Sequence, residues 1–384
     1  NTFELSPESR YTKKEAAVKL IHRIISRVFK TRDLAKRSPK NNHTLEPFFS
    51  YRTASIFLIA FLTIYLGFRF FHIDWGLVAG TLKSLNIWNY LAALIAYYFS
   101  FIFRGVRWRL IARNASEPDD YELQDLKGHT PPLEGFTNFR STILVLCGWF
   151  VNSLIWLRLG DAYRAYCLGV VSKLGFPWAL GTLVAERVLD MAIVFVAILF
   201  SFMMLSTGIH SQAIQILIIC STIITFLLLS FVLLLLYGED WVMSLIPTPV
   251  KPYYQKFKMG VLKSFKNIVV ICGLGLLVWL MEVTRMFFVT EALNIEIPIY
   301  LIILASMSNA VLSTFPTPGG IGFVEPGLTG ILLIFVASSD AAAVTLLDRS
   351  ITYISILILG GLAFLFHYIW FGRELNSKSA TVSS

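Results

Sequence analysis

The chain has 384 residues, of which 56% are hydrophobic and 15% charged, and its mean hydropathy is +0.66. This composition excludes an ordinary soluble globular domain and indicates a polytopic membrane protein. The net charge of +9 would suggest nucleic acid in a soluble protein, but in a membrane protein an excess of Lys and Arg marks the cytoplasmic flanks of the helices. We therefore expect no nucleic acid partner.

Residues 1–50 are polar and basic and lack the early apolar stretch of a signal peptide. Residues 16–29 place apolar side chains at helical spacing beside Lys19 and Arg23. This pattern fits a helix lying on an anionic membrane surface, and a mobile basic tail is the alternative.

Six apolar runs approach or exceed the length of about 18 residues that a membrane-spanning helix needs. They cover residues 54–71, 88–103, 177–205, 213–237, 268–290 and 341–370. Basic residues fill the N-terminal segment, residues 104–113 and residues 251–266, which the positive-inside rule places in the cytoplasm. The loops at 72–86, 207–211 and 291–298 contain few Lys or Arg residues and are expected outside.

Two further apolar regions, 139–159 and 301–337, must each begin and end on one side of the membrane if this topology holds. We therefore expect both to be re-entrant, and to enter from opposite faces. The second contains the sequence TFPTPGGIGFVEPG at 314–327, whose three prolines and four glycines no continuous helix accommodates. Broken backbone at membrane depth is tolerated only where protein or a water-filled cavity satisfies its polar groups.

The fold class expected is an all-α integral membrane protein with about six transmembrane helices and two oppositely oriented re-entrant helical elements. Each re-entrant element precedes a helix with an acid–arginine pair, which suggests an inverted repeat with a midplane site, and the sequence leaves that symmetry open. The expected parts are a basic cytoplasmic segment (1–50), a membrane domain (51–373) and a cytoplasmic tail (374–384). Both termini are expected in the cytoplasm, and the membrane is expected to be the cell membrane.

A charge at the centre of a spanning helix costs roughly 2.5 to 3.5 kcal/mol, so each such residue should be paired, near a helix end or functional. Asp161 and Arg164, and likewise Glu282 and Arg285, are three residues apart and share a helix face. Arg104, Arg107 and Arg109 are expected to extend toward the membrane surface. The candidate substrate-binding residues are Asp161, Arg164, Glu186, Arg187, Asp190, Glu282, Arg285, Pro318, Gly319, Gly320, Gly322, Glu325, Asp348 and Arg349.

The chemistry of these residues suits a charged headgroup. Arginine presents a planar fork that matches a phosphate, whereas a carboxylate in a low dielectric would hold an amine or a proton. Glycines let backbone amides approach a ligand, and a helix starting after them would favour an anion. The four cysteines and six histidines are scattered and no HExxH pattern occurs, so no metal and no cofactor are expected.

Three stretches together resemble the flippase-like domain family, also called the lysylphosphatidylglycerol synthase transmembrane region: NSLIWLRLGDAYRAYCLG from Asn152, TLVAERVLDMAI from Thr182 and LSTFPTPGGIGFVEPGL from Leu312. The family's PxPGGxGxxE element is matched by Pro316, Pro318, Gly319, Gly320, Gly322 and Glu325. Its GExxR element appears as Gly160, Asp161 and Arg164, with Asp in place of Glu and without the upstream proline. Its ER followed by D is kept as Glu186, Arg187 and Asp190.

This resemblance implies a freestanding lipid translocase without the soluble aminoacyl-transferase domain to which some members are fused. The function expected is translocation of a phospholipid or lipid-linked polar headgroup between leaflets, not catalysis. Two alternatives stay open, namely a secondary transporter of a soluble solute and a membrane-bound transferase that uses a lipid-linked donor. A membrane lipid is the expected partner, and a homo-oligomer is left open.

Overall fold

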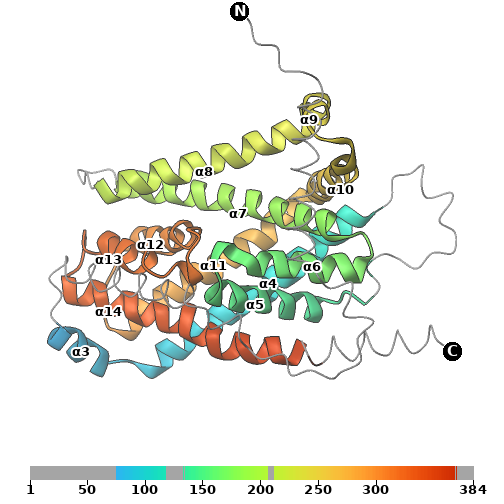
Figure 1. Ribbon diagram of the computed structural model, residues 1–384. Coiled ribbons are helices and arrows are strands. Elements are labelled where there is room, and N and C mark those ends of the chain that lie inside the picture. Colours follow the sequence, from blue (N-terminus) through green and yellow to red (C-terminus); the bar gives the residue numbers. More distant parts are fainter. Residues whose placement is uncertain (1–74, 118–132, 134, 206–211, 368, 370–384) are drawn as a thin grey trace, which may run out of the picture. The chain divides into compact units, whose positions relative to one another are not determined.

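The computed structural model describes residues 75–117, 133, 135–205, 212–367 and 369, and all of them lie in helices, turns or loops (Figure 1). They belong to the compact unit Ile56–Ser384. The expected interfacial helix at 16–29, the apolar run at 54–71 and the tail at 374–384 lie outside the described residues. The expectation of an all-helical chain is confirmed for the described part.

Twelve α-helices occur in the described ranges. They are α3 (Trp75–Lys83), α4 (Ile87–Ser116), α5 (Asn138–Leu154), α6 (Leu159–Ser172), α7 (Phe176–Leu205), α8 (Gln212–Tyr237), α9 (Glu239–Leu245), α10 (Lys251–Leu262), α11 (Ile268–Ala292), α12 (Ile299–Leu312), α13 (Val324–Leu332) and α14 (Ser338–Arg349). The apolar runs at 177–205, 213–237 and 268–290 thus become α7, α8 and α11 almost residue for residue.

Three described helices are long and apolar enough to cross a membrane, namely Ile218–Tyr237, Ile268–Ala292 and Ser338–His367. The last comprises α14 and its continuation through two π-helical turns. A fourth span results if α3 and α4, which meet at an angle of 88°, are counted as one. The membrane-protein class expected from composition is therefore supported by the helices themselves.

Two connecting segments expected to be loops contain helices. Part of 72–86 forms α3, and most of 251–266 forms α10. The side chain of Asn86 accepts hydrogen bonds from the backbone N–H groups of Trp88 and Asn89, so it caps α4 and separates this helix from α3. Charge and low hydrophobicity marked these segments as connections between spans, but those properties do not exclude a short surface helix.

The first broken region, 139–159, contains α5 and a turn, and the second arm of the hairpin, α6, extends beyond the expected region to Ser172. The turn is tight because Leu157 and Arg158 both adopt left-handed backbone conformations, with φ of 59° and 54°. The Gly160 N–H donates to Asn152 Oδ1 at 2.8 Å and ties the two arms together. An added Cβ on Gly160 would collide with the Gly148 carbonyl oxygen, so glycine permits the close approach of α5 and α6.

The second broken region folds as α12, a glycine-rich loop and α13. The loop needs glycine because Gly319, Gly320 and Gly322 have φ of 57°, 72° and 84°, values that side-chain-bearing residues rarely adopt. The expected interruption of the helix at 314–327 is therefore confirmed. Its physical cause is the left-handed backbone at three glycines together with the prolines between the two helices.

The tips of these two hairpins touch. The Leu157 N–H donates to the Pro316 carbonyl at 3.5 Å, and Arg158 Nη1 donates to the Ser313 carbonyl at 3.0 Å. Both broken segments thus satisfy part of their backbone hydrogen bonding through each other, as irregular backbone in a nonpolar environment requires. Helix α5 also packs against the glycine-rich tip.

Candidate functional site

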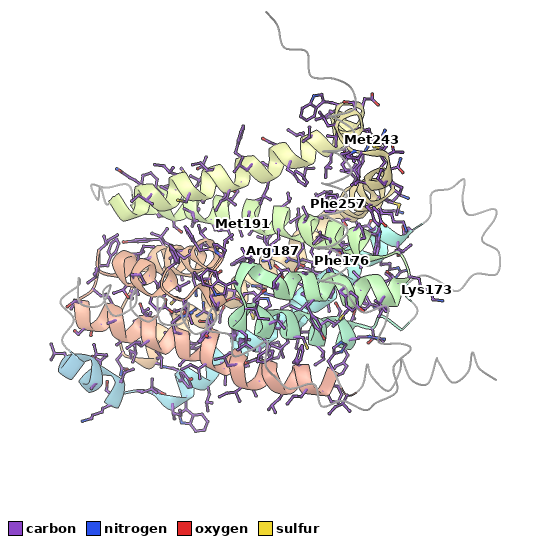
Figure 2. The ribbon with its side chains drawn as sticks, viewed as in Figure 1. Lys173, Phe176, Arg187, Met191, Met243 and Phe257 are labelled. Carbon is purple, nitrogen blue, oxygen red and sulfur yellow. The ribbon has the colours of Figure 1, made fainter. Side chains whose placement is uncertain are left out.

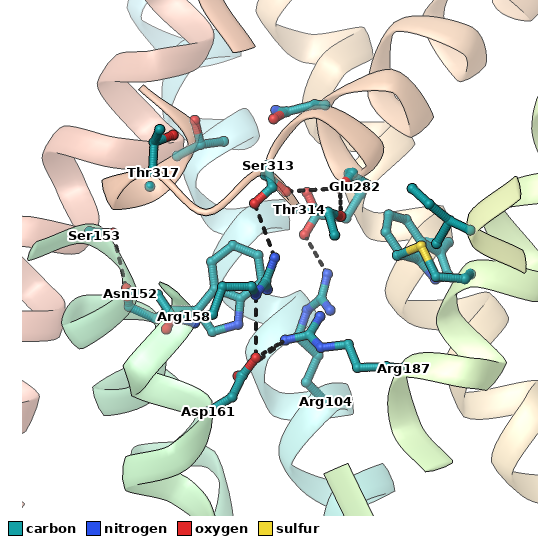
Figure 3. Close-up of a pocket in the computed structure, with 18 of the residues that line it drawn as sticks. Arg104, Asn152, Ser153, Arg158, Asp161, Arg187, Glu282, Ser313, Thr314 and Thr317 are labelled. Atoms are coloured by element: carbon teal, nitrogen blue, oxygen red, sulfur yellow. Dashed lines mark hydrogen bonds and ion pairs between the residues drawn. The ribbon is translucent and has the colours of Figure 1, made fainter. Parts of the chain in front are cut away.

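A cavity of about 420 Å³ lies where the two hairpin tips meet (Figure 3). Most of the lining comes from α4, α5, α6, α7, α11, α12 and α14 and from the two tips, and it combines charged and polar groups with the aromatic rings of Tyr97, Trp149 and Trp279. The charged residues in this lining are Arg104, Arg158, Asp161, Arg187, Glu282 and Arg349. Helix α8 lines the cavity with apolar side chains only, namely Ile224, Leu227 and Leu228, and Met191 on α7 adds a further apolar side chain.

The apolar wall is thin. Leu227 lines the cavity, and 62% of its surface is exposed. The neighbouring Ile223, Phe226 and Leu229 are also exposed, and α8 runs alongside α7 (Figure 1). The cavity therefore has ion-pairing groups on one side and, on the other, a single helix whose outer face is suited to hydrocarbon.

Six ion pairs join the side chains of one cluster, the α6–α7 cluster, made of Arg107, Arg158, Asp161, Arg164, Glu186, Arg187 and Asp190. Arg107 on α4 binds both α7 carboxylates, with Nη1 to Asp190 at 2.7 Å and Nη2 to Glu186 at 3.2 Å. Arg164 Nη2 donates to the other Glu186 oxygen at 2.9 Å, and its guanidinium lies over the Trp108 ring at 4.3 Å. The cluster joins α4, α6 and α7.

Asp161 is the carboxylate of this cluster that reaches the cavity. Arg187 Nη2 lies 3.0 Å from it and Arg158 Nε 3.3 Å, while Arg164 Nη1 is more distant at 3.8 Å. Arg187 and Met191 are one turn apart on α7, and both line the cavity (Figure 2). Asp161 and Arg164 share a helix face as expected, but the shorter contacts join Asp161 to Arg158 and Arg187.

A second group, the α11–α14 cluster, contains Arg104, Glu282, Arg285 and Asp348. Glu282 accepts from Arg104 Nη2 at 3.0 Å and from Arg285 Nε at 3.2 Å, so Glu282 and Arg285 share a face of α11 as their spacing predicts. Arg285 also pairs with Asp348, which accepts from Asn309 Nδ2 at 3.1 Å. Two arginines thus balance two carboxylates, and only Arg104 and Glu282 of the four line the cavity.

Glu325 and Arg349 form a clamp on the glycine-rich tip. Arg349 Nε lies 2.8 Å from Glu325 Oε1, and its Nη2 donates to the Gly319 carbonyl at 2.9 Å. The other oxygen of Glu325 accepts from the Gly322 N–H at 2.7 Å. The anion that this glycine N–H was expected to attract is therefore supplied by the protein itself, so Glu325 shapes the tip.

Five of the fourteen candidate residues line the cavity, namely Asp161, Arg187, Glu282, Gly319 and Arg349. Six charged candidates lie behind this lining and hold it in place through ion pairs: Arg164, Glu186, Asp190, Arg285, Glu325 and Asp348. Pro318, Gly320 and Gly322 belong to the tip but not to the lining. The structure thus brings the candidates into one region, and their role in binding stays a prediction.

The structure places Arg104 and Arg107 elsewhere than the sequence predicted, and it brings Arg158 into the site, which the sequence did not predict. Arg104 and Arg107 were expected to extend to the membrane surface, but they are 4% and 0% exposed because α4 continues past the apolar run to Ser116 and carries them between α7 and α11. Arg158 was not a candidate. Its position three residues before Asp161, beside a helix break, was the available signal.

We also looked for side chains that could bind a metal ion in the part of the chain that the structure describes. No group of three or more His, Cys, Asp or Glu side chains there is arranged to hold a metal ion. The charged groups of the site are arginines and carboxylates engaged with one another. Such an arrangement can bind a charged ligand by exchanging one ion pair for another.

Replacing Glu325 by Ala is expected to lower the free energy of unfolding by about 3 kcal/mol, because it leaves Arg349 buried without its carboxylate and the Gly322 N–H without its acceptor. Glu325→Gln keeps a side-chain acceptor for the Gly322 N–H and should lose less. The apparent melting temperature of the detergent-solubilised protein measures this order. Glu291→Ala, at an exposed position on α11, is the control; equal melting of all three variants would contradict the clamp.

Residues 53–360 match the family described as the Lysylphosphatidylglycerol synthase TM region. The chain is also similar to a UPF0104 membrane protein of Methanocaldococcus jannaschii, with 30% identity over 224 residues that cover 56% of this chain and 93% of the relative. A UPF0104 membrane protein of Pyrococcus horikoshii is 23% identical over 321 residues, covering 75% and 90% of the two chains. No solved structure matches the chain significantly. With four-fifths of its length matched, the chain belongs to the Lysylphosphatidylglycerol synthase TM region family.

Proposed function

We propose that this protein moves a phospholipid or a lipid-linked polar headgroup between the leaflets of a cell membrane. The observation that carries the proposal is the two-sided cavity, which has ion-pairing groups at the hairpin tips and an apolar wall on α8. A headgroup would bind on the polar side while its acyl chains stay next to hydrocarbon. The family is named after a phospholipid synthase, which agrees with a lipid substrate.

The lengths of the hairpin helices support the re-entrant arrangement. Helices α5 and α6 have 17 and 14 residues, and α12 and α13 have 14 and 9. At 1.5 Å per residue these helices extend over about 14 to 26 Å, less than the hydrocarbon core of about 30 Å. In our proposal the hairpins enter from opposite faces and meet near the midplane among about six spans, with both termini in the cytoplasm and the two halves related as an inverted repeat.

The proposal is tested by reconstituting the purified protein in liposomes with fluorescent phospholipids and measuring the rate at which label becomes accessible to a membrane-impermeant quencher. We expect faster leaflet exchange than in empty liposomes. Glu282→Gln should slow the exchange, because it weakens an ion pair in the cavity wall, whereas the exposed Glu291→Gln should not. Rates equal to those of empty liposomes for anionic, zwitterionic and cationic headgroups would contradict the proposal.

The two rival functions give different results in the same preparation. A secondary transporter of a soluble solute would take up a water-soluble compound without exchanging lipids. A transferase would convert a lipid-linked donor into product. The α8 wall favours a lipid over a soluble solute, because the same helix that lines the cavity with Ile224, Leu227 and Leu228 also carries the exposed apolar residues Ile223, Phe226 and Leu229.

A further inference from the structure

The charges of the α6–α7 cluster do not balance. It contains four arginines (Arg107, Arg158, Arg164 and Arg187) and three carboxylates (Asp161, Glu186 and Asp190), so it carries one excess positive charge. The α11–α14 cluster and the clamp are each neutral as paired. An uncompensated charge is costly in a nonpolar environment unless a counterion joins it.

The excess is located at the cavity. Arg107 and Arg164 expose 0% and 2% of their side chains and are held by Glu186 and Asp190. Arg158 and Arg187 expose 24% and 27%, and both line the cavity with Asp161 between them. Two accessible guanidinium groups therefore share one carboxylate (Figure 3).

Arg158 is held at this place by the backbone. It and Leu157 occupy left-handed conformations that residues with side chains rarely adopt. Its Nη1 group bonds to the Ser313 carbonyl on the other hairpin. Such conformations persist only where the surrounding structure holds them, and they cluster at active and ligand-binding sites.

We infer that the cavity binds a phosphate group between Arg158 and Arg187, with Asp161 as the competing internal anion, and that the phosphate belongs to a lipid of net negative charge. The planar fork of arginine matches phosphate oxygens in a bidentate manner, and one added anion neutralises the α6–α7 cluster. The acyl chains of such a lipid would lie against Met191, Ile224 and Leu227. The inference rests on the proposed function for the bilayer as the source of the ligand and specifies the charge of its substrate.

The test is binding to the purified full-length chain in detergent, measured by titration with native mass spectrometry. The ligands are phosphatidylglycerol, diacylglycerol, which lacks the phosphate, and inorganic phosphate, which lacks acyl chains. We expect phosphatidylglycerol to bind most tightly. Arg158→Gln and Arg187→Gln should each weaken its binding about tenfold, as the loss of one charge-assisted contact predicts. Arg113→Gln, at an exposed position near the end of α4, should leave binding unchanged.

Asp161→Asn is expected to change the affinity for phosphatidylglycerol in the opposite direction. It removes the internal competitor and should tighten binding of phosphatidylglycerol, a result that a merely structural role for Asp161 does not produce. If an Arg→Gln variant fails to fold, two other single variants, Asp161→Asn and Arg158→Lys, still test the inference. Equal binding of diacylglycerol, or unchanged binding in the Arg158 and Arg187 variants, would overturn the inference.

The outcomes separate this inference from the proposed function. Lipid exchange in liposomes together with equal binding of diacylglycerol and phosphatidylglycerol keeps the function and contradicts the phosphate site. Phosphate-dependent binding without leaflet exchange supports the site and contradicts the function. Binding of inorganic phosphate as tight as that of phosphatidylglycerol supports the anion site and contradicts a lipid as its ligand.

Discussion

Arg107→Ala is expected to destabilise the protein by about 3 to 5 kcal/mol, the range measured when one partner of a buried ion pair is removed. The Arg107 side chain is completely buried, and its two carboxylate partners on α7 are 1% and 4% exposed. Without the guanidinium, Asp190 keeps the Trp279 indole N–H as a neutral donor but loses its arginine. The apparent melting temperature should fall far below that of Arg113→Ala, in which an exposed arginine of the same helix is removed.

Combining Arg107→Met with Asp190→Asn should recover part of this loss. The asparagine still accepts from Trp279, and Glu186 still pairs with Arg164 at 2.9 Å. Replacing a buried ion pair by neutral groups of similar volume is often close to neutral for stability. Equal melting temperatures of Arg107→Ala and Arg113→Ala would contradict the role of Arg107 in joining α4 to α7. A double variant that melts no higher than Arg107→Ala would contradict it as well.

Gly160→Ala is expected to separate the arms of the α5–α6 hairpin. The added Cβ would collide with the Gly148 carbonyl oxygen and lie 2.7 Å from Asn152 Oδ1, so the helices must move apart. Overpacking of this kind costs typically about 1 to 3 kcal/mol. Because Asn152 and Asp161 both line the cavity, the same variant should also slow leaflet exchange. Melting temperature and exchange rate are measured on one preparation.

The matched control is Gly273→Ala on α11, where an added Cβ meets no atom within 4 Å. Alanine is preferred to glycine inside a helix by about 1 kcal/mol, so this variant should melt at the wild-type temperature or above it. The contrast between two Gly→Ala changes in helices isolates the effect of the close approach. Equal effects of the two changes would contradict the packing of α5 on α6.

Local features of this fold could be predicted from the sequence. Long, predominantly apolar runs located α7, α8 and α11, because a helix that spans lipid needs about 20 mostly apolar residues. The glycines and prolines at 314–327 located a break, because their backbone conformations exclude a continuous helix. The pairs Asp161–Arg164 and Glu282–Arg285 followed from helical spacing alone and are present in the structure.

Contacts between distant segments could not be predicted in this way. The partners of Arg107 lie about 80 residues further along the chain, so its burial depends on how α4 and α7 pack. Arg158 enters the cavity through a left-handed backbone position that its sequence does not specify. The Gly322 N–H, which was expected to bind a ligand, donates instead to the Glu325 carboxylate. The chain folds back over three residues to bring that carboxylate there.

The most direct test of this account is an electron cryomicroscopy map of the protein in a lipid nanodisc. The account predicts that residues 154–159 and 313–323 lie at the depth of the acyl chains, in contact with each other, with Arg158 and Arg187 facing a cavity between them. A map in which either segment crosses the bilayer as a continuous helix, or lies in the aqueous phase, would contradict it.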